Sequence, residues 1–156
     1  MIKYPNGKVG KTYKSESKRS VKNRGMTLEK IINASNLYYL EADKAVIYKK
    51  PTPVQIVNVS YPSRNKAKIT EAYYQTPSTT DYNGIYKGRY IDFDVKESRN
   101  KTSFPIKNVH AHQIEHLRRV HEHGGLAFLI IHLKADDTFW LLPFEALAVF
   151  VNRSIK

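Results

Sequence analysis

Acids and a lysine alternate with apolar residues over residues 90–96, and this stretch of the chain is the best equipped for chemistry. Such alternation is typical of a β-strand, and it places Asp92, Asp94 and Lys96 on one face, with the apolar side chains on the other. Turn-forming residues separate this strand from Asp81. The chain can therefore fold back as a hairpin and bring the Asp81 carboxylate beside that of Asp94.

Carboxylates that lie this close together suit a divalent cation. They repel one another and raise each other's pKa unless a cation or a basic side chain lies between them. Mg²⁺ prefers oxygen ligands, keeps several waters and takes only one or two carboxylates from a protein. Lys96 points the same way and could orient an attacking water or stabilise charge growing on a phosphate. The same residues also fit a solvated hairpin face with an ordinary cross-strand ion pair.

The composition indicates one domain with a polyanionic partner. The chain has 156 residues, of which 41% are hydrophobic, enough to bury a single core. Its 26 Lys and Arg exceed its 14 Asp and Glu and leave a net charge of +12, which favours nucleic acid as the partner. No stretch approaches ~18 consecutive apolar residues, so no membrane association is expected. The absence of cysteine excludes disulfides and thiolate metal sites, and it favours a cytoplasmic location.

A basic N-terminal arm is predicted over residues 1–25, followed by a domain over residues 26–156. The arm holds many Lys and Arg, Arg24 among them, against the single acid Glu16. It lacks periodic apolar residues, so it should be disordered alone and could order along a phosphate backbone. A merely solubilising tail is the alternative.

Hydrophobic periodicity and capping signals predict the remaining elements. Helices are expected over residues 27–40, 109–123 and 144–150, and strands over 45–49, 54–59, 126–133 and 138–142. The pairs Asn83-Gly84 and Lys87-Gly88 are both interpreted as turns of the hairpin that precedes the strand at 90–96. The order of helices and strands predicts an α/β domain with a mixed sheet.

Basic and aromatic residues near the second strand predict contacts with DNA. Residues 60–80 are expected to form a projecting extended arm or a two-stranded ribbon. Its basic side chains could follow phosphates while its tyrosines stack on unpaired bases. A half-buried strand with its tyrosines packed on the body is the alternative. The candidate DNA-binding residues are Arg24, Lys49, Lys50, Arg64, Lys66, Lys68, Tyr73 and Tyr74.

The histidine-rich helix over residues 109–123 offers a different kind of site. His112 and His116 are four residues apart and lie on one face, a geometry that can bind Zn²⁺. No His-Glu-x-x-His motif is formed. A solvated or phosphate-facing helix is the alternative. Gln113 could offer its carbonyl oxygen to a metal or its amide to a phosphate.

A series of motifs spans nearly the whole chain. They are Tyr4-Pro-Asn-Gly-Lys8, Asn23-Arg-Gly-Met-Thr-Leu-Glu29, Lys49-Lys-Pro-Thr-Pro-Val-Gln-Ile-Val-Asn-Val59, Thr79-Thr-Asp-Tyr-Asn-Gly84, Tyr90-Ile-Asp-Phe93, Asn100-Lys-Thr-Ser-Phe-Pro105 and His112-Gln-Ile-Glu-His116. In these motifs and their order the chain resembles the RecU-type Holliday junction resolvases, members of the PD-(D/E)xK nuclease superfamily. The resemblance implies a restriction-endonuclease-like α/β fold, with a mixed sheet flanked by helices. It also implies a projecting stalk over residues 63–76, with Tyr73 and Tyr74 near its tip.

The function implied by the resemblance is that of a homodimeric endonuclease that nicks two opposed strands of a four-way DNA junction. The family uses Mg²⁺ or Mn²⁺, and a recombinase is a further expected partner. Close relatives usually carry Glu at the position of Asp94 and are expected to continue beyond the end of this chain. A non-catalytic junction or single-stranded DNA binding protein is the alternative function. The family's metal positions fall on Thr79, Asp81, Asp94 and Gln113, and its catalytic lysine falls on Lys96.

Overall fold

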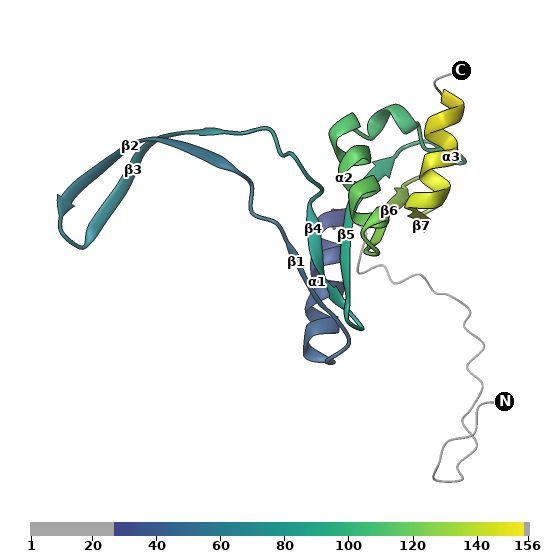
Figure 1. The fold of residues 1–156 in the computed structure, drawn as a ribbon, viewed down its shortest axis with the longest axis horizontal. Helices are drawn as coiled ribbons and strands as arrows, with labels where there is room; N and C mark the ends of the chain where they lie inside the picture. Colours follow the sequence, from purple (N-terminus) through teal and green to yellow (C-terminus); the bar gives the residue numbers. More distant parts are fainter. Residues whose placement is uncertain (1–26, 155–156) are drawn as a thin grey trace, which may run out of the picture.

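The structure is a computed structural model, and it describes residues 27–154. These residues form a body built on a five-stranded sheet, and a two-stranded ribbon that projects far from it (Figure 1). The arm predicted over residues 1–25, including Arg24, lies outside the described residues. In chain order the elements are α1 (Leu28–Glu41), β1 (Val46–Lys49), β2 (Val54–Ser63), β3 (Lys66–Tyr74), β4 (Tyr82–Tyr86), β5 (Arg89–Ser98), the 3₁₀ helix η2 (Ile106–Asn108), α2 (Ala111–Glu122), β6 (Leu126–Leu133), β7 (Thr138–Pro143) and α3 (Phe144–Ser154).

The five strands of the body form a mixed sheet in the order β1-β4-β5-β6-β7. β5 and β6 pair in parallel, whereas every other neighbouring pair is antiparallel. A parallel pair needs a crossover connection, and the segment that contains η2 and α2 supplies it. The mixed α/β architecture that the sequence and the family resemblance implied is confirmed, as is the projecting ribbon.

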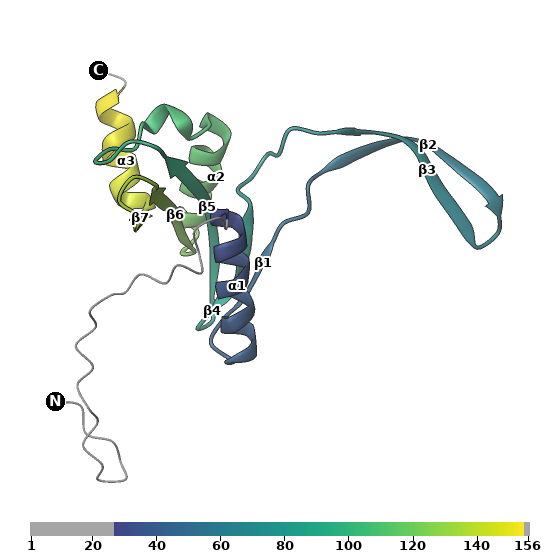
Figure 2. The same ribbon diagram turned by 180° about the vertical axis from the view of Figure 1, so that it is seen from behind.

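Helices cover both faces of the central strands. α1 packs on one face against β1 and β5, and α2 and α3 pack on the other against β6 (Figure 1 and Figure 2). On the α1 face the ring of Phe93 stacks between those of Tyr82 and Phe128, with centroids 4.9 and 4.8 Å away. The continuous apolar run of β6 follows from this layering, because both faces of the strand are covered. Within the described part of the chain, no helix is long and apolar enough to cross a membrane.

The same double coverage excludes a solvated hairpin face as the setting of the acids in β5. Helix α2 contacts β5 on the face that carries Asp92 and Asp94, and these residues are 0% and 1% exposed. Lys96, on the same face, is largely buried as well. The polar face of β5 is therefore an interior one, and its charges need partners within the protein.

The hairpin between β4 and β5 turns at Lys87 and Gly88, as predicted. Their φ angles of +47° and +75° are the left-handed values that a two-residue hairpin turn of this kind requires. The turn predicted at Asn83 and Gly84 is wrong, because both residues lie inside β4. Gly84 is needed there for a different reason: a Cβ atom at this position would lie within the backbone of β1.

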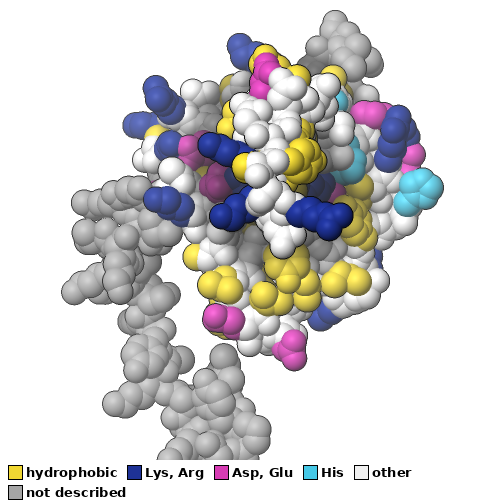
Figure 3. Space-filling model, turned by 90° about the vertical axis from the view of Figure 1, so that its left-hand side faces the viewer, with side chains coloured by type: hydrophobic (Ala, Val, Ile, Leu, Met, Phe, Trp, Pro, Cys, Tyr) yellow, Lys and Arg dark blue, Asp and Glu magenta, His cyan; other side chains and the backbone are white. Residues whose placement is uncertain are grey.

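The ribbon pairs β2 with β3 in an antiparallel arrangement. The stalk predicted over residues 63–76 is too short on its N-terminal side, because β2 already begins at Val54. The chain reverses between Ser63 and Lys66, which are paired at the tip. Figure 3 looks along the ribbon toward the body, and Lys and Arg side chains are spread over this side of the molecule. Most side chains of both strands are exposed, so the ribbon stands clear of the body.

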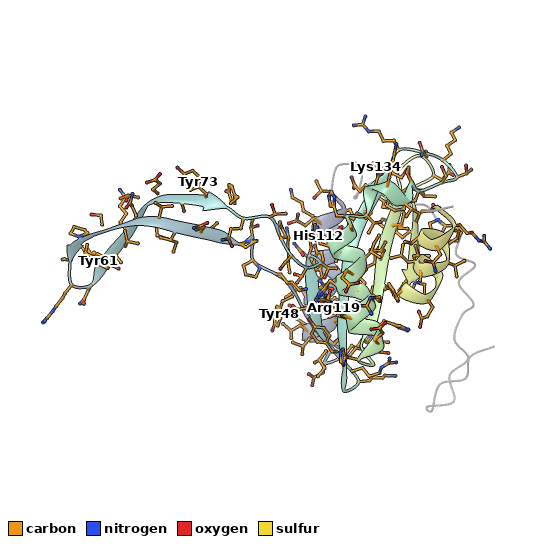
Figure 4. All side chains as sticks on the ribbon, turned by 45° about the horizontal axis from the view of Figure 1, so that its top comes forward. Tyr48, Tyr61, Tyr73, His112, Arg119 and Lys134 are labelled. Carbon is orange, nitrogen blue, oxygen red and sulfur yellow. The ribbon has the colours of Figure 1, made fainter. Side chains whose placement is uncertain are left out.

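The expected position of Tyr73 and Tyr74 near the tip of the ribbon is wrong. Both tyrosines pair with the first residues of β2, at the base of the ribbon, whereas Tyr61 lies farther out (Figure 4). Tyr61 and Tyr74 are 70% and 84% exposed. The place of a residue along a ribbon is set by the pairing register, and the reversal between Ser63 and Lys66 places Tyr73 and Tyr74 opposite the start of β2.

Replacing Gly84 with Ala should destabilise the body, because the added methyl group has no space between β4 and β1. We expect the free energy of unfolding to fall by about 3 kcal/mol, measured by guanidinium denaturation. Gly88→Ala is the matched control: its φ is positive but its surroundings are open, so the loss should be about 1 kcal/mol. Equal losses in the two variants would contradict the close approach of β1 to Gly84.

Candidate active site

Three polar side chains meet on the buried face of β5, beside the first turn of α2. The Lys96 ammonium lies 3.2 Å from Asp94 Oδ2 and donates to Gln113 Oε1 at 2.9 Å. Gln113 Nε2 donates in turn to the same oxygen of Asp94. The backbone N–H of His110 steadies Gln113 by donating to Oε1 at 3.3 Å. A strand and a helix thus bring together a carboxylate, an ammonium and an amide, all three at positions that the sequence predicted.

Burial raises the pKa of Asp94 above its ordinary value. The Lys96 ammonium and the N–H of Val95, which donates to Asp94 Oδ1 at 2.7 Å, act against burial without overcoming it. The negative charge of Asp81 adds to the rise. A carboxylate in this condition is stabilised by any further positive charge that reaches it.

Asp81 and Thr79 lie on the segment that returns from the ribbon to β4. The backbone carbonyl of Asp81 accepts from the N–H of Lys50 at 2.7 Å, which ties this segment to the end of β1. Thr79 is half-buried, and its hydroxyl donates to the carbonyl of Thr80 at 3.3 Å. The candidate ligands therefore come from three separate parts of the chain: β5, α2 and this returning segment.

The chemistry of these donors fits a hard divalent cation. Asp81 and Asp94 offer carboxylate oxygens, Gln113 a carbonyl oxygen and Thr79 a hydroxyl, the types of ligand that Mg²⁺ and Mn²⁺ prefer. The raised pKa of Asp94 is an independent reason, because a buried carboxylate with incomplete compensation favours a cation beside it. Two carboxylates with waters completing the shell is the usual arrangement for Mg²⁺.

A second carboxylate, Asp92, is buried on the same face and was not predicted to be a site residue. It accepts from Lys50 Nζ at 2.8 Å, from Tyr90 OH at 2.8 Å and from the Thr80 hydroxyl, and it lies 3.0 Å from His116 Nε2. Burial alone would raise the pKa of Asp92, but these partners outweigh it and hold the pKa below its ordinary value. The alternation of polar and apolar residues in β5 predicted that Asp92 shares a face with Asp94 and Lys96. No pattern in the sequence indicated the hydrogen-bond partners of Asp92, which are distant along the chain.

The lysines predicted to bind DNA at the end of β1 have partners inside the protein. Lys49 forms an ion pair with Glu29 at 2.6 Å, and Lys50 is held by Asp92. Both lysines are therefore less available than the sequence suggested. Lys49 stays exposed at the end of β1. The other exposed residues predicted to bind DNA lie on the ribbon: Arg64, Lys66, Lys68, Tyr73 and Tyr74.

The zinc alternative finds no support in α2. His116 faces Asp92, whereas the ring of His112 stacks on that of His110 with centroids 5.5 Å apart. A zinc site needs three or four nitrogen, sulfur or oxygen ligands around one point. Over residues 27–154, no group of three or more His, Asp and Glu side chains could hold such an ion.

Comparison with known proteins places the chain in a family. The family model described as Recombination protein U, or RecU, matches residues 23–156. The chain belongs to the RecU family. The Holliday junction resolvase RecU of Staphylococcus carnosus (strain TM300) is 57% identical over 162 residues, which cover 97% of this chain and 77% of that protein. The protein of the same name from Staphylococcus aureus (strain JH9) is 52% identical over 161 residues, with the same coverage.

A solved structure, that of the Holliday junction resolvase Hjc from Archaeoglobus fulgidus, is also similar. It is 12% identical, and the match covers 75% of this chain and 77% of that one with a TM-score of 0.44. A likeness this distant carries no argument, so membership of the RecU family rests on the sequence matches. The part of the chain matched by the RecU model contains every predicted metal position and Lys96.

In buffer with EDTA, Asp94→Asn should be more stable than the parent at neutral pH. The pKa of Asp94 is raised in the folded state, so folding is favoured with the proton bound, and this stability is lost as the pH rises through the folded pKa. The amide avoids that loss and should raise the unfolding midpoint by about 2–4 °C. Thermal unfolding across a pH series measures the difference, which should shrink as the pH falls below the folded pKa. A difference that grows on acidification would contradict the raised pKa.

Proposed function

We propose that this protein is a metal-dependent endonuclease that resolves Holliday junctions by nicking two opposed strands of the four-way DNA. The observation that carries the proposal is the contact of Asp94, Lys96 and Gln113 on the buried face of β5, within the field of Asp81. RecU relatives at 57% and 52% identity are named Holliday junction resolvases, which supports the choice of substrate.

The side chains of this site would divide the work of phosphodiester hydrolysis. Asp81 and Asp94, with the oxygens of Thr79 and Gln113, would hold Mg²⁺ or Mn²⁺. Such a cation, when bound, lowers the pKa of a water ligand and stabilises negative charge on the phosphate. Because Asp94 is covered by α2, its charge is little screened by solvent, and its hold on a cation is correspondingly stronger.

Lys96 would act on the attacking water or on the phosphate. An ammonium group has three N–H donors, and the contacts with Asp94 and Gln113 occupy two of them. The third donor would orient a water for in-line attack on phosphorus, or donate to a phosphate oxygen as the bond to the leaving oxygen breaks. The products are a phosphate monoester end and a hydroxyl end.

The ribbon would bring the junction to this site. It carries Arg64, Lys66 and Lys68 at and near its tip, where they are exposed and can neutralise phosphates. Tyr61 and Tyr74 are exposed at different heights along it and can stack on bases that are unpaired at a crossover. The ribbon strands both adjoin the site, since β2 follows the end of β1 and β3 leads back to Asp81.

A homodimer is part of the proposal. The described part of each chain carries one candidate site of this kind, and two nicks in opposed strands require two sites. Two copies related by a two-fold axis would present equal sites to a junction that has the same symmetry.

Asp94→Asn should lower junction cleavage by roughly 10²–10³-fold, the usual effect of removing one electrostatic stabiliser from an active site. Junction binding should survive, because the basic residues of the ribbon are untouched. Cleavage and binding are to be measured on one synthetic four-way junction across a Mg²⁺ titration. Glu97→Gln is the matched control, since Glu97 lies on the same strand but pairs with Lys134. A parent that binds the junction without cutting it at any Mg²⁺ concentration would favour the non-catalytic alternative.

Replacing Arg64, Lys66 and Lys68 together with Ala should weaken junction binding and flatten its salt dependence. If each side chain neutralises one phosphate, the slope of log affinity against log salt should fall in magnitude by about 2.7. Lys134→Ala removes a positive charge away from the ribbon and should leave the slope nearly unchanged (Figure 4). An unaltered slope in the triple variant would mean that the ribbon does not contact phosphate.

A further inference from the structure

Asp92 is fully buried, yet the proposed mechanism gives it no part. Its carboxylate lies on β5 two residues before Asp94 and on the same face. A carboxylate has about four acceptor positions. Lys50, Tyr90 and His116 lie at Oδ2, and Thr80 donates to Oδ1. An ammonium and three further donors already compensate the charge of Asp92, so this carboxylate has little need of a cation and is poorly suited to be a metal ligand itself.

Two of these partners hold the segment that returns from the ribbon. Thr80 lies between the candidate ligands Thr79 and Asp81, and its hydroxyl donates to Asp92 Oδ1. Lys50 Nζ lies 2.8 Å from Asp92 Oδ2 and 3.1 Å from the Thr80 hydroxyl, and its backbone N–H donates to the Asp81 carbonyl at 2.7 Å. One carboxylate therefore fixes this segment through a hydroxyl and an ammonium together.

A third partner holds α2. His116 Nε2 lies 3.0 Å from Asp92 Oδ2, and His116 follows Gln113 by three residues, so both side chains leave the same face of the helix. Tyr90 adds a donor from β5 itself, and the Asn83 amide steadies the Tyr90 hydroxyl at 3.2 Å. Asp92 thus joins β5, α2 and the returning segment, the three parts of the chain that carry the candidate ligands.

We propose that Asp92 is a positioning residue: its carboxylate sets the spacing of the oxygens that bind the cation, without touching the cation itself. The inference rests on the proposed function. An amide in its place would leave the mostly buried Lys50 ammonium without its charge partner and would turn an NH₂ group toward one of the donors. The returning segment and α2 would then shift relative to β5. Mg²⁺ demands near-octahedral geometry, so a small shift weakens its site.

The inference is tested by measuring the affinity of the full chain for Mn²⁺ without DNA. EPR monitors the concentration of free Mn²⁺. Asp92→Asn should bind Mn²⁺ about 10-fold more weakly than the parent, as expected for a residue that orients ligands. High Mn²⁺ should restore most of its junction cleavage, whereas Asp94→Asn should lose the site, and its lowered cleavage should not recover. Glu97→Gln is the matched control, because Glu97 is an ion-paired acid of the same strand whose partner Lys134 contacts no candidate ligand. Its Mn²⁺ affinity should stay within about twofold of the parent.

Parent-like Mn²⁺ affinity in folded Asp92→Asn would overturn the inference. So would a complete loss equal to that of Asp94→Asn, since Asp92 would then be a ligand. If Asp92→Asn does not fold, His116→Ala decides, because that side chain is partly exposed and its loss removes only the tether to α2. The Mn²⁺ affinity of His116→Ala should fall by roughly 10-fold, and an unchanged value overturns the inference. A parent that binds no Mn²⁺ at a site sensitive to Asp94→Asn refutes the proposed function, and the inference fails with it.

Discussion

Asp92 and Asp94 face the same way on β5, two residues apart, beneath a helix. A buried carboxylate is unfavourable unless donors replace the water it has lost, and two in succession also repel each other. The two carboxylates are compensated to different degrees. Asp92 is surrounded by donors and keeps its charge readily, whereas Asp94 has an ammonium and an amide and still has a raised pKa. The first acid is suited to hold segments together. The charge of Asp94 is only partly compensated, so a further positive charge beside it is favourable, as a cation site requires.

The architecture of the body supplies the partners that these acids need. Because β5 and β6 run in parallel, the chain must cross over the sheet between them, and the crossover lays α2 on the face of the acids. Gln113 and His116 then reach the two carboxylates from one side of that helix. On the opposite face α1 and the stacked ring of Phe93 form an apolar layer, so polar chemistry is confined to one side of the sheet.

Sequence patterns predicted helices and strands correctly where the deciding residues are close together in the chain. The apolar run at 126–133 predicted β6 with the bounds that it has, and Thr27 predicted the start of α1, where its hydroxyl accepts from a backbone N–H of the first turn. Patterns failed where the deciding partner is distant in sequence. Gly84 has turn propensity, but pairing with β1 draws it into a strand. Lys50 looked like a phosphate ligand until the fold placed Asp92 against it, and the register of the ribbon moved Tyr74 to the base.

The base of the ribbon lies beside the polar cluster around Asp92. The N–H of Gln75 donates to the Pro53 carbonyl at 3.0 Å, so the two strands stay joined down to their base, and just below it Lys50 and Thr80 both bind Asp92. The ribbon is about 30 Å long, at ~3.3 Å per residue. It is attached to the body at this polar cluster. Thr80, which is held in this cluster, has a candidate ligand on either side. If the proposed site holds a cation, the base of the ribbon and the ligands of that cation share one anchor, so a displacement of the base would change the spacing of the ligands.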